Sequence, residues 1–291
     1  MDAVITYVDG SDPIWREEYS RFAGPAREGR RFRDWGTLKY LLRGISANMP
    51  FVENVFLVVS SDSQVPEWLS PSVRVVRHAE IIPSDLLPCF NSCTIEIFLP
   101  AVPGLSEEFL YFNDDVFPLR PCRPEDFFRD GKTKMRFSRE WPACGMYRKQ
   151  CRNSSDLARK ALGMPPAAVF VRPQHTCAPM LRSACLRALE AVGEDIGGRV
   201  SRFRSGRDAN QYFFQDYLYY SGLSTGEGIS SRNVSTALRG PRSAAAFLEN
   251  PSVDIVCLND VEMPWRRFEK YRRAVLETFG RLFPEKSRFE K

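Results

Sequence analysis

The sequence lacks the short motifs by which several classes of protein are recognised. No two cysteines have the Cys-x-x-Cys spacing, and the chain has only 2 histidines, His78 and His175. A structural zinc site is therefore disfavoured, and the 8 cysteines are expected to be reduced, mostly buried thiols. Glycine-rich loops of the P-loop and G-x-G-x-x-G types are also missing, which disfavours a P-loop ATPase and a dinucleotide-dependent dehydrogenase.

Long hydrophobic runs and a strong charge imbalance are missing as well. No apolar segment approaches the roughly 18 residues of a membrane span, and the first residues resemble no secretion signal. We expect a cytoplasmic protein, in which an amphipathic C-terminal helix (about 263–283) packs on the domain; peripheral contact of this helix with the inner face of the membrane is the alternative. The 41 Lys+Arg against 36 Asp+Glu give a net charge of +5, which suits anionic substrates but is no nucleic-acid footprint.

Short apolar runs alternate with helical patterns along most of the 291 residues. This order predicts an α/β fold with a mostly parallel, Rossmann-like central sheet flanked by helices. The chain is expected to form a single catalytic domain, 1–291, with a proline-rich irregular or helical insertion at about 118–165. Strands are predicted at 3–8, 54–60, 73–78, 108–114, 167–171 and 253–258, and helices at 34–47 (with Asp34 as N-cap), 179–192, 208–221 and 263–283.

Several predicted strands end abruptly in polar residues. These ends are Asp9-Gly10-Ser11-Asp12, His78, Asn113-Asp114-Asp115 and Asn259-Asp260. In open α/β sheets the ligand crevice lies outside the carboxyl ends of the strands. A single polar strand end is usually a turn, but carboxylates at several ends favour a polyanion held through a divalent cation.

The adjacent carboxylates Asp114 and Asp115 are the sharpest feature. Facing a dry crevice together they would repel each other unless a cation screened them. Mg²⁺ or Mn²⁺ takes oxygen ligands and bridges phosphate oxygens, which suits a nucleotide diphosphate donor. The alternative is an Asx-type turn with both side chains in solvent.

The histidines and one arginine cluster supply candidates for the remaining chemistry. His175 lies in a predicted loop, where an imidazole can act as general base for an acceptor hydroxyl, although loop histidines often have no such role. His78 is the weaker catalytic candidate. A basic cluster is formed by Arg202, Arg204 and Arg207, whose guanidinium groups either bind phosphate oxygens or lie in a solvated turn. The following Asp208 either caps the next helix or binds a metal ion. Arg30, Arg31 and Arg33 form a second basic cluster with the same alternatives.

The chain also resembles a known family through four blocks in order. The first is Ile5-Thr-Tyr-Val-Asp-Gly-Ser-Asp-Pro-Ile-Trp15. The second runs from Arg33-Asp34 through Leu38–Arg43, Val65–Leu69 and Phe90–Glu96 to Gly104-Leu-Ser and Tyr111–Asp115. The third is His175–Pro179, Phe203-Arg-Ser and Asp208, and the fourth is Val256–Asp260. These blocks resemble the Stealth proteins, which include bacterial capsular polysaccharide phosphotransferases and the catalytic part of the lysosomal-enzyme GlcNAc-1-phosphotransferase. The chain departs from the family pattern at Tyr7, usually Trp, and at Trp35-Gly36-Thr37, usually a polar-polar-Glu run.

The resemblance implies transfer of a hexose-1-phosphate, commonly from a UDP-sugar such as UDP-GlcNAc, to a sugar hydroxyl in capsular or exopolysaccharide synthesis. It implies catalytic roles for Asp115, His175 and Arg204, and donor binding by the first block and the Arg33–Arg43 segment. Asp114, Asp115 and Asp260 are the predicted ligands of Mg²⁺ or Mn²⁺. The predicted substrate-binding residues are Asp9, Gly10, Asp12, Arg33, Asp34, Arg43, His78, Asn91, Ser92, Glu96, Asn113 and Asp208.

Three points stay open at the level of sequence. A metal-dependent glycosyltransferase with the same donor would release UDP and form a glycoside, whereas a phosphotransferase releases UMP and forms a phosphodiester. A nucleotide-sugar-binding protein without turnover is the non-enzymatic alternative. The general base is either His175 or a carboxylate.

Overall fold

The computed structural model describes residues 1–23, 32–142, 144–235 and 240–291. Arg30 and Arg31 of the predicted basic cluster lie outside these residues. Among the described residues, no helix is long and apolar enough to cross a membrane.

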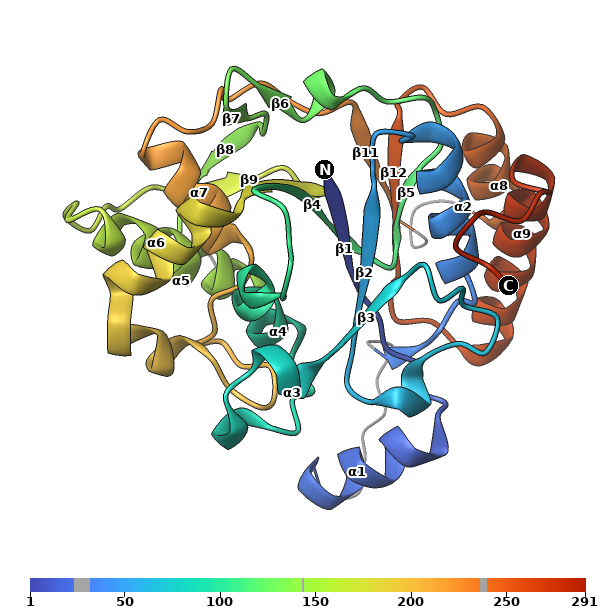
Figure 1. Cartoon of the computed structure of the whole chain (residues 1–291), viewed down its shortest axis with the longest axis horizontal. Coiled ribbons are helices and arrows are strands. Elements are labelled where there is room, and N and C mark those ends of the chain that lie inside the picture. The colour runs from blue at the N-terminus through green and yellow to red at the C-terminus, as the bar shows by residue number, and fades with distance from the viewer. Residues whose placement is uncertain (24–31, 143, 236–239) are drawn as a thin grey trace.

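A five-stranded sheet forms the centre of the molecule (Figure 1). Its strand order is β10 (Ala178–Leu181), β4 (Glu108–Asn113), β1 (Asp2–Thr6), β2 (Asn54–Val59) and β3 (Arg74–Arg77). The last four strands are parallel, and β10 pairs with β4 in the antiparallel direction. Pro179 is tolerated because β10 is an edge strand, where a missing N–H costs no ladder bond. The predicted α/β fold with a mostly parallel sheet is confirmed.

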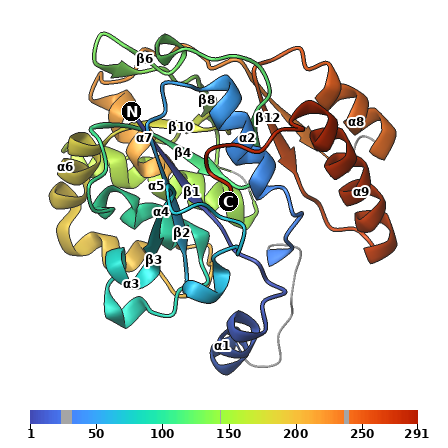
Figure 2. The same cartoon turned by 45° about the vertical axis from the view of Figure 1, so that its right-hand side comes forward.

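Both faces of this sheet are buried, which explains why its strands are apolar without interruption. On β2, Val55, Leu57 and Val59 enter one hydrophobic core, and Phe56 and Val58 enter the other. This alternation is the two-residue period of a strand covered on both sides. The first core includes residues of α2 (Leu38–Asn48) and α9 (Trp265–Leu282), whereas α4 (Ser92–Phe98), α6 (Arg182–Val192) and α7 (Tyr212–Tyr220) contribute to the second (Figures 1 and 2).

A second sheet extends from the end of β4. In it β11 (Ser231–Ser235) runs parallel to β12 (Ile255–Asn259), and β12 pairs in the antiparallel direction with β5 (Val116–Pro118). The strand predicted at 253–258 therefore belongs to this sheet rather than to the central one. Only Asp114 and Asp115 separate β4 from β5, and the backbone oxygen of Asp115 accepts from Leu258 N at 2.8 Å. Both carboxylates thus lie where the two sheets meet.

The remaining elements are peripheral or short. Residues 118–165 contain the hairpin β6–β7, the strand β8, which pairs with β9, and the long helix α5, which packs on α7. Helix α8 packs on α9, and α1 stands apart from the central sheet in both views (Figures 1 and 2). Their bounds are α1 (Pro13–Ala23), α3 (His78–Ile81), β6 (Phe128–Arg129), β7 (Lys132–Thr133), β8 (Phe137–Glu140), α5 (Met146–Ala161), β9 (Phe170–Pro173) and α8 (Pro241–Glu249).

Three predicted helix starts are wrong, for local reasons. The helix predicted at 34–47 begins only at Leu38, because Gly36 adopts φ 71° and the Asp34 carboxylate accepts from Gly36 N instead of capping a helix. The first residues of the segment predicted at 179–192 extend as β10, and α7 begins at Tyr212 rather than at 208. The C-terminal amphipathic helix is confirmed as α9, with Phe268 and Phe279 among its buried residues.

Candidate active site

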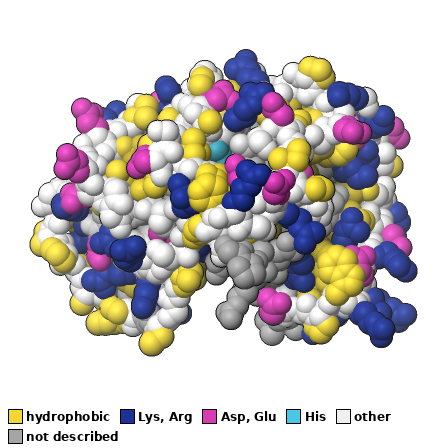
Figure 3. Space-filling view, turned by 90° about the horizontal axis from the view of Figure 1, so that it is seen from below, with side chains coloured by type: hydrophobic (Ala, Val, Ile, Leu, Met, Phe, Trp, Pro, Cys, Tyr) yellow, Lys and Arg dark blue, Asp and Glu magenta, His cyan; other side chains and the backbone are white. Residues whose placement is uncertain are grey.

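A cavity of about 860 Å³ opens at the carboxyl ends of β1 and β4. Charged side chains of both signs and hydrophobic side chains meet around a histidine on the face that looks onto these strand ends (Figure 3). The predicted site residues that line the cavity are Arg33, His78, Ser92, Asn113, Asp114, Asp115, Arg204 and Asp260. Segments far apart in the chain therefore contribute to one concave site, as expected for a ligand pocket.

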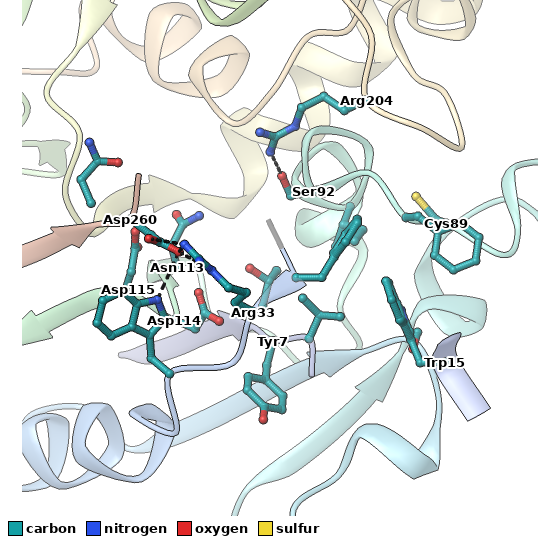
Figure 4. A pocket seen from close by; sticks show the side chains of 18 of the residues that line it. Tyr7, Trp15, Arg33, Cys89, Ser92, Asn113, Asp114, Asp115, Arg204 and Asp260 are labelled. Carbon is teal, nitrogen blue, oxygen red and sulfur yellow. Dashed lines mark hydrogen bonds and ion pairs between the residues drawn. The ribbon is translucent and has the colours of Figure 1, made fainter. Parts of the chain in front are cut away.

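Asp114 and Asp115 occupy one wall of this cavity, next to Asn113 (Figure 4). Burial, reinforced by the neighbouring charges of Asp115 and Asp34, raises the pKa of Asp114 well above its usual value. Burial also raises the pKa of Asp115, and His175 opposes that shift. The Asp115 Oδ1 atom has no hydrogen-bond partner among the described residues. This wall therefore holds more negative charge than the protein itself satisfies.

His175 and Cys257 lie beside Asp115. Ligand-type atoms of these three side chains lie within 4.8 Å of one another. The Cys257 thiol donates to Asp115 Oδ2 at 3.6 Å, and burial, together with the charge of Asp115, raises the pKa of this thiol well above its usual value. Without a metal ion this thiol is therefore expected to stay protonated, and the three side chains form a mixed oxygen, nitrogen and sulfur set that could hold a metal ion. His175 does not line the main cavity itself but reaches its carboxylate wall from the loop between β9 and β10.

Asp260 and Arg33 form an ion pair at the same wall. Arg33 Nη2 donates to both Asp260 oxygens at 2.8 Å, and Arg33 Nε donates to Oδ2 at 3.2 Å. The guanidinium also stacks on Phe268, 4.4 Å from the ring centroid. Asp260, predicted as a metal ligand, thus has its charge balanced by Arg33. These hydrogen bonds use the Nε and Nη2 atoms of Arg33. The Nη1 atom forms none with the described residues and can therefore bind a ligand.

Arg204 forms the opposite wall with Ser92 (Figure 4). Its Nη2 donates to the Ser92 hydroxyl, and both side chains line the cavity. The loop that carries Arg204 is held from below by Asp208, whose carboxylate accepts from Asn91 Nδ2 at 2.9 Å and from Ser205 N at 2.6 Å. Asn91 also caps α4 through Cys93 N. Asp208 and Asn91, predicted to bind substrate, are buried and position the residues that do line the cavity.

Other predicted residues lie outside the main cavity. Asp9 accepts from Ser11, and Asp12 accepts from Ile14 N at the start of α1. Gly10 packs against Phe32, where an added Cβ would lie 2.4 Å from the backbone oxygen, so no larger residue fits. Asp9 and Asp34 line a smaller cavity of about 510 Å³, which shares Tyr7 with the main one.

Arg43 and Glu96 are engaged elsewhere in the fold. Arg43 donates through two nitrogens to the Glu290 carboxylate, at 2.7 and 2.8 Å, and lies away from both cavities. Glu96 is buried behind Arg204, where it accepts from Gln211 N and from the Tyr111 hydroxyl. Burial raises the pKa of Glu96. Neither the Glu96 carboxylate nor the Arg43 guanidinium is therefore placed to contact a ligand in the main cavity.

The two histidines differ in their surroundings. His78 is buried at the start of α3, and burial lowers its pKa to about 4. Its Nδ1 atom has no partner among the described residues. Half-buried His175, by contrast, has the Tyr212 hydroxyl 3.3 Å from its Nδ1 atom. His175 thus lies beside the carboxylate wall with one ring nitrogen next to a hydroxyl group.

The sequence analysis missed an aromatic wall and two tyrosines. Trp15, Phe90 and Phe203 line the cavity on the side of α1, with ring centroids 5.6 Å apart for the first two. All three lie in the family blocks, since Trp15 closes the first, Phe90 opens a segment of the second and Phe203 opens one of the third, and these blocks are the sequence signal for the wall. Tyr147 lines the cavity and contacts Tyr212, but both sit in helical patterns that read as ordinary packing residues.

These features together suit a ligand with a polyanionic centre and flat or apolar ends. The carboxylates can hold a cation, the two guanidinium groups can bind phosphate oxygens, and the aromatic rings offer a surface for a base or a sugar. His175 stands close enough to the carboxylates to serve a reaction there. The site is therefore equipped for chemistry at a phosphate group.

Residues 31–136 match the Stealth protein CR2, conserved region 2. The capsular polysaccharide phosphotransferase WcwK of Streptococcus pneumoniae is 30% identical, over 100% of this chain and 99% of that protein. The exopolysaccharide phosphotransferase cps2G of Lactiplantibacillus plantarum is 29% identical, over 100% of this chain and 96% of that protein. A crystal structure of the galactosyltransferase LgtC covers 97% of this chain and 96% of that chain at 12% identity, with a TM-score of 0.42 that supports no functional argument. The similarity to WcwK extends along both chains, and the chain therefore belongs to the Stealth family of polysaccharide phosphotransferases.

Proposed function

We propose that the protein transfers a sugar-1-phosphate from a UDP-sugar, with UDP-GlcNAc as the first candidate, to a hydroxyl of an acceptor saccharide. The products are a phosphodiester and UMP, and the acceptor belongs to a capsular polysaccharide or exopolysaccharide. The observation that carries this proposal is the pair Asp114–Asp115, which forms no ion pair with a Lys or Arg among the described residues, in a cavity that also presents Arg33 and Arg204. The whole-length similarity to capsular and exopolysaccharide phosphotransferases supports it.

The donor fits the cavity by size and by charge. A volume of about 860 Å³ lies in the upper part of the range for small-molecule sites and leaves room for a nucleotide sugar and an acceptor group. Arg33 is fixed by Asp260 and Phe268, so its remaining N–H groups can bind a diphosphate with little loss of side-chain freedom. The aromatic wall formed by Trp15, Phe90 and Phe203 is the proposed surface for the flat base.

Asp114 and Asp115 are the residues that would hold a divalent cation. Carboxylate oxygens suit Mg²⁺ and Mn²⁺, and Asp115 Oδ1 is free of hydrogen bonds to the described residues. Burial raises the pKa of each carboxyl, so a cation bound beside them would favour their charged forms. Such a cation would neutralise part of the negative charge of the donor diphosphate. Asp260 is paired with Arg33, so we do not include it among the ligands.

The chain's own residues then perform the transfer. His175 accepts the proton of the acceptor hydroxyl as its oxygen attacks the sugar-bearing phosphorus in line. The bond from that phosphorus to the bridging oxygen breaks, and UMP leaves with the electron pair. Arg204, steadied by Ser92, stabilises charge on the transferring phosphoryl oxygens. The bond between the sugar carbon and its oxygen stays intact, so the anomeric configuration is retained.

Phosphorus NMR of a reaction mixture tests the proposal. The full chain is incubated with UDP-GlcNAc, a saccharide acceptor and Mg²⁺ or Mn²⁺, and then with other nucleotide sugars. We expect signals of UMP and of a phosphodiester, in equal amounts. Release of UDP with a new glycoside would make the protein a glycosyltransferase. Donor binding without turnover across donors and acceptors would make it a binding protein.

A further inference from the structure

We infer that Tyr212 is a positioning residue that holds His175 as the tautomer with its proton on Nδ1, and that Tyr147 completes a hydroxyl chain from His175 to the cavity. This inference rests on the proposed role of His175 as general base. It assigns a function to two tyrosines that otherwise look like packing residues of α7 and α5.

The chain of contacts links a buried residue to the cavity. The Tyr212 oxygen lies 3.3 Å from His175 Nδ1 and 3.0 Å from the Tyr147 oxygen. Tyr212 is 2% exposed, whereas Tyr147 is 48% exposed and lines the cavity. Both residues lie in the first turn of their helices, and α5 packs on α7. Two packed helix starts therefore bring the hydroxyl groups together behind the imidazole.

The donors and acceptors of this chain can be ordered from the chemistry. A general base needs a bare Nε2, so a neutral ring must carry its proton on Nδ1, and that N–H needs an acceptor. The Tyr212 oxygen accepts it, and the Tyr212 hydroxyl is then left to donate to Tyr147. Arg172, which can only donate, also reaches the Tyr147 hydroxyl. The Tyr147 oxygen has two lone pairs for these two donors, and its own proton can face the cavity. Each hydrogen bond along the chain then has one donor and one acceptor.

Proton uptake requires no rearrangement of this chain. When Nε2 takes the proton of the acceptor hydroxyl, the ring becomes an imidazolium and Nδ1–H continues to donate to Tyr212. Burial raises the pKa of Tyr212 well above its usual value, so its hydroxyl remains neutral and keeps both a donor and an acceptor. Tyr212 thus keeps the base in one orientation while the proton is transferred.

The tautomer can be read directly, because the chain has only 2 histidines. Two-bond proton–nitrogen correlation spectra of ¹⁵N-histidine-labelled full-length protein, at mildly alkaline pH, distinguish a protonated from a bare ring nitrogen. The signals missing from His175→Gln identify His175. We expect a protonated Nδ1 and a bare Nε2 in the unaltered protein. The opposite pattern in that protein overturns the inference, and His78→Gln, which should keep the His175 signals, checks the assignment.

Tyr212→Phe removes one oxygen and keeps the ring. We expect the His175 signals to shift toward a mixture of tautomers, and kcat to fall about 10-fold with little change in the KM of the donor. Tyr220→Phe is the matched control, because it removes a hydroxyl of the same helix that contacts Ser155 and not His175. An unchanged tautomer in Tyr212→Phe, or an equal shift in Tyr220→Phe, contradicts the inference. Failure of the proposed function would appear separately, as absence of UMP release from the unaltered protein.

Discussion

The carboxylates that follow β1 and those that follow β4 differ in how far the protein satisfies them. After β1, Asp9 accepts from Ser11, and Asp12 accepts from Ser63, Gln64 and the start of α1. Desolvation works in the other direction, but these hydrogen bonds lower the pKa of Asp12. After β4, burial raises the pKa of both Asp114 and Asp115. Satisfied carboxylates hold the fold together, whereas unsatisfied ones are available to a ligand.

This contrast has a cost in stability. A buried carboxylate without a partner favours its protonated form, and like charges next to each other add to the penalty. The protein accepts this penalty at the junction of the two sheets, whereas hydrogen bonds satisfy the Asp9 and Asp12 carboxylates after β1. Sites of function are where such penalties are commonly found. The contrast therefore predicts which substitutions reduce activity and which reduce stability.

The largest effect is expected at the unsatisfied end. Asp115→Asn should lower turnover on the order of 10³-fold, about 4 kcal/mol of transition-state stabilisation, because the neutral amide cannot hold a cation against the diphosphate. In EDTA the melting temperature of this variant should equal or exceed that of the unaltered protein, because the substitution removes a desolvated charge. UMP release and thermal unfolding measure the two effects. Near wild-type turnover in a folded Asp115→Asn protein would remove this carboxylate from the site.

Buried His78 provides a second unsatisfied group, and its effect appears in stability rather than in activity. Its pKa is lowered by burial from 6.5 to about 4. Between these pH values the unfolded chain binds a proton that the folded chain does not, so stability falls as the pH decreases through this window. The loss attributable to His78 should reach about 3 kcal/mol at the acid end.

Denaturant unfolding from pH 7 to pH 4 measures this loss in the unaltered protein and in His78→Gln. The glutamine variant is expected to lose less stability over this range, whatever its stability at pH 7. The slope is therefore the observable, and differences in packing do not affect it. Parallel stability curves for the two proteins would show that His78 titrates normally in the folded state.

Arg204 and Arg202 show the same contrast between an available and a satisfied charged group, here for positively charged side chains. Arg202 donates to the backbone oxygens of Pro88 and Leu87 and is satisfied, whereas Arg204 faces the cavity with Ser92. Arg204→Ala should lower turnover on the order of 10²-fold, about 2.7 kcal/mol, with a small effect on melting temperature. Arg202→Ala, by contrast, should lower the melting temperature and leave turnover nearly unchanged. Equal losses of turnover in both variants would mean that the loop acts as a unit and that Arg204 has no separate role.

Much of the carboxylate wall was predictable, because its signals are local. An apolar run ending in Asn113-Asp114-Asp115 marks a strand end by residue type alone, and strand ends gather at one edge of a parallel sheet. The pairing of Arg33 with Asp260 was not predictable, because it joins positions 227 residues apart in the chain. The contact between Tyr147 and Tyr212 depends on how two helices pack. Helical periodicity reports a buried face, but it carries no information about which partner that face meets.

The smallest effect is expected at the satisfied end of the comparison. Asp12→Ala removes the acceptor for Ile14 N at the start of α1, together with the bonds from Ser63 and Gln64. The loss should be about 1 kcal/mol of unfolding free energy, the usual value of such a cap, with turnover nearly unchanged. Asp12→Asn is the matched control, because an amide oxygen can still accept at this position, and it should recover most of the stability. A large loss of turnover in Asp12→Ala that Asp12→Asn does not restore would place a ligand on this carboxylate as well, and the two strand ends would then share one function.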